Sequence, residues 1–557
     1  MNEAKRRGGL KQRVLRAKPD RNAKPIRNVS YDVSEIPPEL WAAIATFASR
    51  QCLARLCAAS HEFYSKFSPL LYGNIFDPPL TPVNSSALVG TLSEARAPSG
   101  RPHLAEQVQQ LKLTSCIADI KAVKNLLQNM RRLIPGAELR SGSVLRVLHW
   151  HLAAGLDELG KILGAPGHFP NLKELFVSTT GTNNNFNFIQ IGGLEVLGVT
   201  FSLYTYDREY EDGDKLCYKL AEALQMLPSS SPLLNTLRLN LDIAYDENEF
   251  PYDGFADLVD TINVIHLPLL TTLDMSVEID EEEFGLVDPD TPLRPNFSAF
   301  LALHPTLLHL TLLGTGLPKN FAASFPCLRS FKGSFDESAI ICSCRPPLET
   351  LVIRFVHRMS SDDVFPSLHV VPLTHNLHLT KFKIDAVDYT DETVKLTDEL
   401  SPTSFAQLVS SFPNLIDVDV CINKPMIQYR RVLVLLTKLR TLRLREYKTY
   451  HCTCHNVSCY EDGECYGPKK PIEKVFPPRG YITELSLLIP SLPHLASVEI
   501  SILGDHIPPE PEVDEDILFE PAQIEVDYHF SINRKSKDPK VILNSTQISS
   551  DNRSCFC

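Results

Sequence analysis

The residue types best suited to chemistry are concentrated in one short stretch, residues 451–465, which holds two histidines and four cysteines. Thiolate and imidazole groups are the ligands that Zn²⁺ prefers, so Cys452, Cys454, Cys459 and Cys465 could hold one ion. The Cys-x-Cys spacing is tighter than the spacing of about two to four residues in common zinc sites. We therefore assign no metal site here and keep zinc as a weak candidate beside the alternative, a reduced cysteine-rich surface insertion.

Other titratable groups give weaker signals. Acidic residues cluster at 280–283 and 510–520, where consecutive carboxylates are typical of solvated loops. His149 and His151 flank Trp150 on an expected strand, which places both on one face. We interpret them as side chains satisfied by solvent or by the core rather than as a ligand pair. Phosphate-binding glycine loops, G-x-S-x-G and H-E-x-x-H are missing from the sequence, so we expect a non-enzymatic protein without a cofactor.

Composition excludes two classes of function. The chain has 557 residues, 43% of them hydrophobic, with 55 Lys and Arg against 67 Asp and Glu, for a net charge of −12. A dedicated nucleic-acid binder carries a cationic face, which this balance argues against. Uninterrupted apolar runs such as Val432–Leu436 are far shorter than the roughly 20 residues that span a bilayer. We expect neither nucleic acid nor a membrane as a partner.

The ends of the chain and its cysteine content bear on its compartment. Residues 1–30 carry ten Lys and Arg against Glu3 and Asp20 and have no apolar signal segment, which predicts a basic, disordered tail. The alternative is a nuclear-import or weak anion-binding arm. Fourteen cysteines are too few for a disulfide scaffold, so we expect a reducing compartment, cytoplasmic or nuclear or both.

One short phrase recurs along most of the chain: an apolar residue, two variable residues, leucine or a similar residue, one variable residue, and an apolar residue. Its copies are spaced by about 20 to 56 residues, and the L-x-x-L-x-L pattern is that of the strand in leucine-rich repeats. Copies start at Leu145, Leu172, Leu194, Leu234, Leu270, Leu307, Leu328, Leu348, Leu379, Leu415, Leu439 and Leu495, with a weaker one at Val108.

The segments between these phrases are predicted to be helices. Apolar residues at 255–265 and 405–412 have helical spacing, and Ser401 followed by Pro402 forms a typical helix start. Repeated helix–strand units bury their apolar faces only by stacking. We therefore expect an α/β protein whose residues 105–505 form an irregular leucine-rich-repeat solenoid with a curved parallel sheet. Residues 446–480 form a cysteine-rich insertion, and residues 506–557 an acidic, polar, partly disordered tail.

The N-terminal region differs in kind. Residues 34–76 predict three short helices, with Leu40, Ile44 and Phe47 on one face of the first. Ser49 is placed to cap the second helix, and the third is expected to end before Pro69. Such a small unit leaves apolar side chains exposed that favour a partner. We assign residues 77–104 to a linker.

The string from Ile36 to Phe76 resembles an F-box, whose pattern is roughly Leu-Pro-x-Glu-Leu, then Ile, Phe or Leu, Leu-x-x-Leu and Val-Ser-x-x-Phe. It is especially similar to the fungal variant that closes with Pro-Leu-Leu-Tyr, here Pro69–Tyr72. Ile36 replaces the usual leucine and Ala59 the usual valine. With the repeats, residues 31–76 resemble the leucine-rich-repeat class of F-box proteins. The alternative is an unrelated helical cap on the solenoid.

The resemblance implies a substrate adaptor of a cullin–RING ubiquitin ligase of the SCF type. The F-box would dock on the Skp-type linker subunit, which joins it to a cullin, and the repeats would hold an unknown protein substrate. A scaffold without ubiquitin transfer is the alternative. The docking residues implied by the motif are Ile36, Pro37, Leu40, Ile44, Phe47, Leu53, Leu56, Ala59 and Phe63.

Substrate binding is expected on the inner face of the solenoid, where the variable residue between the last two apolar positions points out of the sheet. In chain order these residues are Arg238, Asp274, Thr311, Val352, Lys383, Asp419, Arg443 and Glu499. Lys383 and Arg443, with Arg238, predict a site for an acidic or phosphorylated segment of the partner. The alternative is binding through loops or through the cysteine-rich insertion.

Overall fold

The computed structural model divides the chain into two compact units, Met1–Gly73 and Asn74–Cys557. The division lies close to the end predicted for the F-box-like region. The structure describes residues 37–75, 89–94, 103–113, 120–130, 144–151, 156–163, 169–180, 186–203, 211–243, 253–279, 295–354, 378–385, 401–422, 424–447, 450–451, 478–507, 522–535 and 539–550.

The first unit contains three helices among its described residues: α1 (Pro38–Phe47), α2 (Arg50–Ala59) and α3 (His61–Tyr72). The Ser49 side chain accepts a hydrogen bond from the backbone N–H of Cys52, which confirms the cap expected there. Ser60 caps α3 in the same way, accepting from the N–H of Phe63. These caps satisfy N–H groups at helix starts that have no partner within the helix.

The core of this unit is small and aromatic. Trp41, Leu53 and Phe67 are buried together, with the Trp41 and Phe67 ring centroids 5.1 Å apart in an edge-to-face arrangement. The expectation that the third helix ends before Pro69 is wrong, because α3 continues through it to Tyr72. Proline removes one backbone donor, but Phe67 in the core and Leu71 packed against the core fix the helix on both sides of it.

The second unit is built on one long sheet, which has 17 strands within the described residues. Its parallel strands are β1 (Asn74–Ile75), β2 (Gln110–Leu113), β3 (Val147–Trp150), β4 (Glu174–Thr180), β5 (Val196–Leu203), β6 (Thr236–Ile243), β7 (Thr272–Ile279), β8 (His309–Leu313), β9 (Ser330–Gly333), β10 (Thr350–Arg354), β11 (Lys381–Asp385), β12 (Asp417–Ile422), β13 (Thr441–Tyr447), β14 (Tyr450–His451) and β15 (Ser497–Ile507). Strands β1 to β13 pair in chain order, and both β13 and β14 pair with β15.

Every predicted phrase coincides with one of these strands. The strand begins two residues after the first apolar position, as in Leu145 and β3 or Leu495 and β15, and the weaker copy at Val108 leads into β2. The expected mixed α/β fold with a long, predominantly parallel sheet is therefore confirmed, and the arrangement is compatible with a solenoid.

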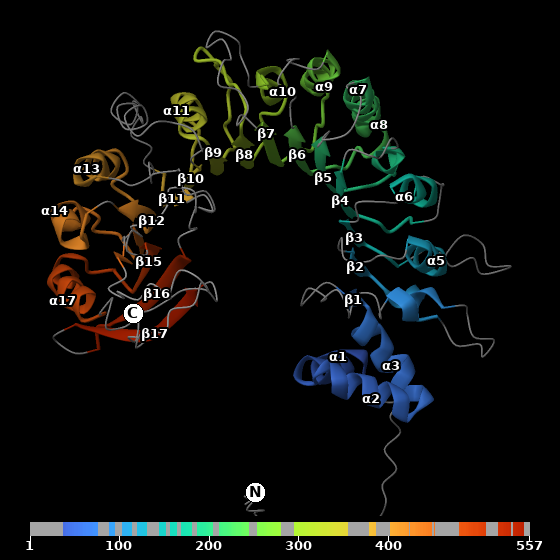
Figure 1. Ribbon diagram of the computed structural model, residues 1–557, viewed down its shortest axis with the longest axis horizontal. Coiled ribbons are helices and arrows are strands. Elements are labelled where there is room, and N and C mark those ends of the chain that lie inside the picture. Colours follow the sequence, from blue (N-terminus) through green and yellow to red (C-terminus); the bar gives the residue numbers. More distant parts are fainter. Residues whose placement is uncertain are drawn as a thin grey trace, which may run out of the picture. The chain divides into compact units, whose positions relative to one another are not determined.

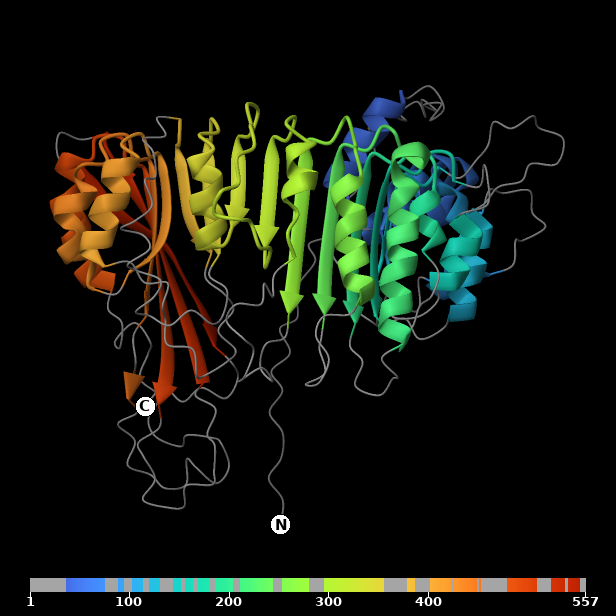
Figure 2. The ribbon, with the colours of Figure 1, turned by 90° about the horizontal axis from the view of Figure 1, so that it is seen from above.

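Helices and short helical turns lie on the outer side of the curved sheet, and the strands line its inner side (Figures 1 and 2). They are η2 (Leu104–Gln107), α5 (Ile120–Met130), α6 (Leu156–Leu163), η3 (Asn187–Gln190), α7 (Glu211–Gln225), α8 (Leu227–Ser230), α9 (Asp253–Val264), α10 (Ser298–Ala302), α11 (Phe335–Ser343), α13 (Pro402–Ser411), η4 (Met426–Tyr429), α14 (Arg430–Leu433), α17 (Pro478–Leu488) and η5 (Ile489–Ser491). The two helices expected at 255–265 and 405–412 correspond to α9 and α13, and Ser401 caps α13 by accepting from Ser404 N–H.

The apolar positions of each phrase form the core between sheet and helices. Leu234, Leu237 and Leu239 are all buried, and Leu237 stands in register between Leu197 on β5 and Leu273 on β7. Because each leucine is covered by its counterparts on both neighbouring strands, no single repeat supports this core alone.

Two boundaries of the predicted solenoid need correction. The predicted tail at 506–557 contains β16 (Ala522–Asn533) and β17 (Lys540–Ser550), which extend the sheet in antiparallel fashion from β15. Val526, Tyr528 and Phe530 are buried at alternate positions of β16. This strand pattern was missed because the acidic stretch beside it favoured a tail.

The predicted linker also contains a residue that packs into the unit. Leu92 is buried, and its carbonyl accepts a hydrogen bond from Asn129 on α5.

The ends of the predicted insertion at 446–480 lie within β13 and α17, with β14 between them. In the described part of the chain, no helix combines the length and apolar character that crossing a membrane requires.

The packing of β16 gives a direct test of this C-terminal correction. Phe530→Ala should lower the free energy of unfolding by about 3–5 kcal/mol, because the ring is 1% exposed and its loss leaves a cavity. Ile542→Ala on β17 is the control, since that side chain is 43% exposed and should cost much less. Urea unfolding followed by circular dichroism measures both. If both substitutions change the free energy of unfolding equally and negligibly, residues 522–550 do not pack on the sheet and the original prediction of a tail holds.

Candidate functional site

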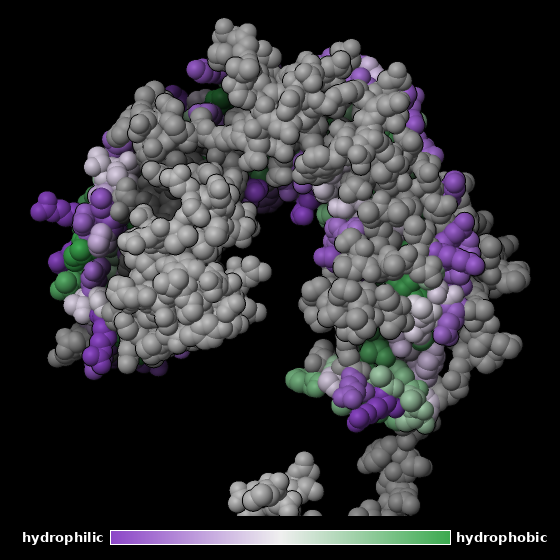
Figure 3. Space-filling model, in the orientation of Figure 1, coloured by the Kyte–Doolittle hydropathy of each residue, from purple (hydrophilic) through white to green (hydrophobic). Residues whose placement is uncertain are grey.

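Helix α1 presents an exposed apolar face. Leu40 is 54%, Ile44 45% and Phe47 92% exposed, at helical spacings of four and three residues. Trp41 and Ala45, on the opposite side, pack into the core of the unit. Apolar side chains lie at the surface of this unit in the space-filling view (Figure 3). The three residues predicted for docking on this helix therefore share one accessible face, which we call the α1 face.

The remaining predicted docking residues divide between surface and core. Pro37 and Ala59 are exposed, whereas Leu56 and Phe63 are half-buried against the core. Leu53 is 5% exposed and is a core residue, so its assignment to a docking surface is wrong. That assignment came from the F-box resemblance and not from the spacing of apolar residues on α2. Ile36 lies outside the described residues.

The predicted inner-face residues of the second unit form one continuous row, which we call the inner row. Arg238 stands in register between Gly198 and Asp274, and Asp419 between Lys383 and Arg443. Glu499 follows Arg443 on β15. The row expected from the repeat phrase is thus confirmed strand by strand.

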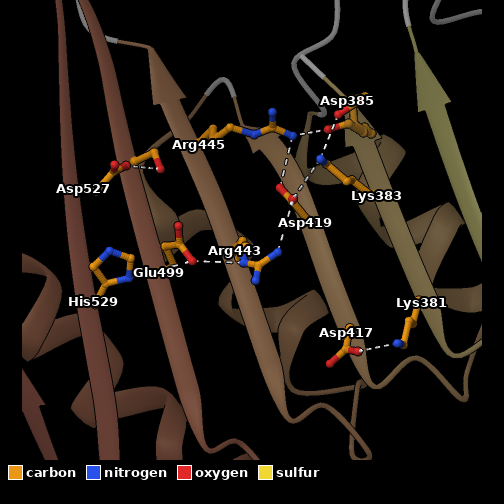
Figure 4. A network of polar contacts seen from close by, with 12 residues as sticks. Lys381, Lys383, Asp385, Asp417, Asp419, Arg443, Arg445, Glu499, Asp527 and His529 are labelled. Atoms are coloured by element: carbon orange, nitrogen blue, oxygen red, sulfur yellow. Dashed lines mark hydrogen bonds and ion pairs between the residues drawn. The ribbon is translucent and has the colours of Figure 1, made fainter. Parts of the chain in front are cut away.

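At the C-terminal end of the inner row the charges neutralise one another (Figure 4). Lys383 Nζ lies 2.8 Å from a carboxylate oxygen of Asp385, and Arg443 Nε donates to Glu499 at 3.0 Å. The carboxylate of Asp419 is 3.1 Å from the Arg445 guanidinium and 4.0 Å from Lys383 and Arg443. Lys383 and Arg443 are therefore each paired with carboxylates of the sheet, although both side chains stay partly exposed. The prediction that they receive an acidic or phosphorylated segment stays a prediction.

The Asp385 carboxylate anchors this network. Burial alone would raise its pKa, but hydrogen bonds and charges from Lys332 and Lys383 outweigh burial and lower the pKa to about 2. The carboxylate stays ionised at neutral pH and keeps both lysines paired.

Arg238, the third predicted substrate residue, lies in a different environment. It lines a hollow of about 360 Å³ on the inner face, formed by side chains from β3 to β10. Lining residues are His151, Phe176, Val177, Ser178, Gly198, Val199, Thr200, Arg238, Leu239, Asn240, Asp274, Ser276, Thr311, Leu313, Lys332 and Arg354. We call this feature the central hollow. The structure thus separates Arg238 from the pair Lys383 and Arg443.

The central hollow carries an excess of positive charge. Arg238, Lys332 and Arg354 are its cations and Asp274 its carboxylate. Lys332 is bonded at 2.6 Å to Asp385, whereas Arg238 and Arg354 form no ion pair with any residue that the structure describes. Burial raises the pKa of Asp274, opposed by the charges of Arg238 and Lys332. With Asp385 included, the three cations exceed the two carboxylates by one charge.

The two histidines predicted to share a face lie beside the hollow. The ring centroids of His149 and His151 are 5.8 Å apart, and the His149 ring lies 4.2 Å from that of Phe176. His151 Nδ1 is 3.3 Å from the Ser178 hydroxyl. Burial first, and then the nearby charges of His151 and Lys112, lower the pKa of His149 to about 4. His149 is therefore neutral at physiological pH.

Sequence reasoning missed Lys332 and Arg354. Lys332 occupies the inner-row position of the phrase that begins at Leu328, so the signal was present in the sequence. Arg354 lies two residues further along its strand than the inner row. Phe176 and Gly198 occupy the same position in the phrases that begin at Leu172 and Leu194, but the position alone does not predict their contact with each other.

The cysteine cluster, Cys452, Cys454, Cys459 and Cys465, lies outside the described residues. Among those that are described, no three or more His, Cys, Asp or Glu side chains are grouped so as to hold a metal ion.

Comparison with known proteins finds neither a family model nor a curated protein that matches this chain. The F-box and leucine-rich-repeat resemblances therefore stay predictions from the motifs.

The pKa of His149 provides a test of the packing at this site. NMR titration of the full chain labelled at the histidine ring carbons should give one resonance with a midpoint near 4, well below the ordinary 6.5, and absent from His149→Gln. Because the neutral ring is the form that fits the fold, its contribution to stability is present above about pH 6.5 and is lost as the pH falls toward 4. A His149 midpoint near 6.5 would contradict the burial against Phe176.

Proposed function

We propose that this chain is a non-catalytic substrate adaptor, which attaches a partner protein to a cullin–RING ubiquitin ligase of the SCF type. The observation that carries the proposal is the α1 face, because a phenylalanine that is 92% exposed beside two exposed aliphatic residues is costly in water. A protein partner that covers these side chains removes that cost. An interface core of aromatic and aliphatic anchors is what protein docking surfaces require.

The occupant of the α1 face is proposed to be the Skp-type linker subunit. The apolar residues on the face, Leu40, Ile44 and Phe47, are those at the docking positions of the F-box pattern, and the capped helices α2 and α3 support them from behind. With Leu53 in the core, the docking set reduces to these residues together with Pro37 and Ala59. Half-buried Leu56 and Phe63 then fix the helix positions.

The second unit is proposed to belong to the leucine-rich-repeat class and to hold the substrate on its inner side. A stacked parallel sheet gives a long, rigid surface whose side chains repeat in register, and this geometry suits recognition of an extended partner segment. Ubiquitin transfer itself would be performed by other subunits of the ligase, with this chain acting by positioning.

The α1 face supplies the test. Leu40→Asp with Ile44→Asp places two charges where the linker docks, and burying unpaired charge costs several kcal/mol, enough to abolish a micromolar complex. The matched control is Val264→Asp with Leu269→Asp, since these apolar side chains are similarly exposed on the second unit. Pull-down of a purified Skp-type linker by the full chain should be lost for the first pair and kept for the second.

If the Leu40 and Ile44 double variant captures the linker as well as the unchanged chain does, the α1 face is not the docking surface for the linker. If the linker binds but a cullin does not co-purify with the complex, the scaffold without ubiquitin transfer replaces the adaptor.

A further inference from the structure

Two outer helices of the second unit, α7 and α9, carry a groove that the proposed adaptor function does not use. The two helices lie side by side on the outer side of the sheet (Figures 1 and 2). Residues 218–225 of α7 and 257–264 of α9 enclose a volume of about 540 Å³ between them. We call this feature the α7–α9 groove. It lies on the helical side of the sheet, whereas the inner row and the central hollow lie on the strand side.

The groove exists because the two helices diverge along their length. Near their first turns the backbones touch: the Gly254 N–H donates to Asp214 Oδ1 at 2.8 Å, and a Cβ at Gly254 would lie 2.6 Å from the Asp214 carbonyl oxygen. Further along, the whole side chain of Gln225 spans the gap and donates to the Thr261 hydroxyl at 3.5 Å. The space between the later turns is therefore left open.

Each helix contributes one face to the groove. The lining residues stand at positions i, i+3, i+4 and i+7, beginning with Tyr218 on α7 and with Asp257 on α9, and this spacing is one side of a helix. Ala221 and Thr261 are buried and form the floor. At the rim Tyr218 is 43% and Val264 72% exposed. Apolar groups exposed to water in this way gain free energy when a partner covers them.

The walls of the groove are acidic. Glu222 on α7 and Asp257 and Asp260 on α9 are exposed, and none of the three forms an ion pair with a residue that the structure describes. Lys219 is the one cation among the described lining residues, so three carboxylates against one ammonium give a net charge of −2. Because carboxylates stand on both helices, a cation on either flank of an occupant finds an opposite charge nearby.

We propose that the α7–α9 groove binds a basic amphipathic helix of a partner protein. Apolar residues of that helix lie over Ala221 and contact Tyr218 and Val264, and its Lys and Arg residues pair with the carboxylates on both walls. The inference goes beyond the proposed function, since the groove includes no residue of the α1 face or of the inner row.

The shape of the groove favours a helix as its occupant. A third helix fits between two that diverge, because helices pack by placing the ridges of one into the grooves of another. Amphipathic helices dock in apolar grooves through anchors at i, i+3, i+4 and i+7, the same spacing that the walls present. The seven-residue step from Tyr218 to Gln225 is about 10 Å long, so the contact takes about two turns of the partner.

The test uses the full chain and an immobilised library of peptides about 14 residues long, a length that allows a helix to form. The helical library has varied apolar residues at i, i+3, i+4 and i+7 and Lys or Arg elsewhere. A scrambled library of the same composition has no apolar helical face, and a third library replaces each Lys and Arg by Glu. Retention by the helical library should exceed that by the scrambled one by about tenfold, with negligible retention by the Glu library.

The contribution of the carboxylates is measured with Asp257→Asn and Asp260→Asn together. This variant should lose about 5- to 20-fold in retention by the helical library, because two exposed ion pairs are removed. Glu94→Gln with Asp336→Asn is the matched control: it makes the same charge change at exposed positions of the same unit and should keep full retention.

The apolar rim is tested without any change of charge. Tyr218→Ala with Val264→Ala should reduce retention by about tenfold. Leu435→Ala with Leu487→Ala is the control, since these side chains are 58% and 46% exposed outside the groove. Urea unfolding of each variant shows that the chain is still folded, as expected for exposed positions.

Three results would overturn the proposal: equal retention by the helical and scrambled libraries, full retention by the Asp257 and Asp260 variant, or an equal loss in the Glu94 and Asp336 control. The last result would mean attraction of cations to an acidic chain as a whole. A peptide with the sequence of residues 1–30 is a further probe. If it is retained more strongly than the helical library and is lost with Asp257 and Asp260, the groove serves a segment of this chain, and a foreign partner is overturned.

This site and the linker site can fail independently. The Leu40 and Ile44 variant should keep full retention by the helical library, and the Asp257 and Asp260 variant should keep full capture of the linker. Loss of both properties in either variant would contradict the assignment of the groove to a separate partner.

Discussion

The stacking of leucines between neighbouring parallel strands is the constraint on which the second unit depends. Leu197, Leu237 and Leu273 occupy the same register position on three adjacent strands, and each is buried by the next. A shift of register by one residue would turn these side chains to the inner face and expose the core. Because the apolar positions are fixed in this way, the variable residue between them is fixed too, and the inner row is a consequence of the core. Its chemistry can therefore vary from strand to strand without changing the fold.

The side chains of the inner row differ between the two parts of the sheet. Near Asp419 cations and carboxylates alternate between neighbouring strands and satisfy one another, which offsets the cost of crowding charges on a concave surface. Exposed ion pairs of this kind contribute little stability each. Their main effect is that opposite charges largely cancel in that part of the inner face. Near Arg238 the row contains Phe176 and Gly198 on one side and Asp274 on the other, and the arginine lies over the Phe176 ring. The two parts of the inner face therefore differ in how their cations are held.

The strand positions and the inner row were predictable from the sequence because each copy of the repeat phrase sets the same register on its strand, although the spacing between copies varies. The α1 face was predictable for the same reason, since helical spacing puts Leu40, Ile44 and Phe47 together. The pairing of Lys383 and Arg443 with carboxylates was not, because it depends on distances between side chains of different strands. The strands β16 and β17 were missed because they are antiparallel additions that lack the phrase. Leu53 was misplaced because the docking set was taken from the F-box resemblance, which does not distinguish residues that contact a partner from residues that form the core.

The adaptor account depends most directly on an unoccupied apolar face that a linker covers. Isothermal titration of the full chain with a purified Skp-type linker at several temperatures measures both the affinity and the heat-capacity change. The account predicts one-to-one binding at micromolar affinity or tighter, with a negative heat-capacity change as Leu40, Ile44 and Phe47 leave water. Absence of binding, or binding with no heat-capacity change, would contradict it.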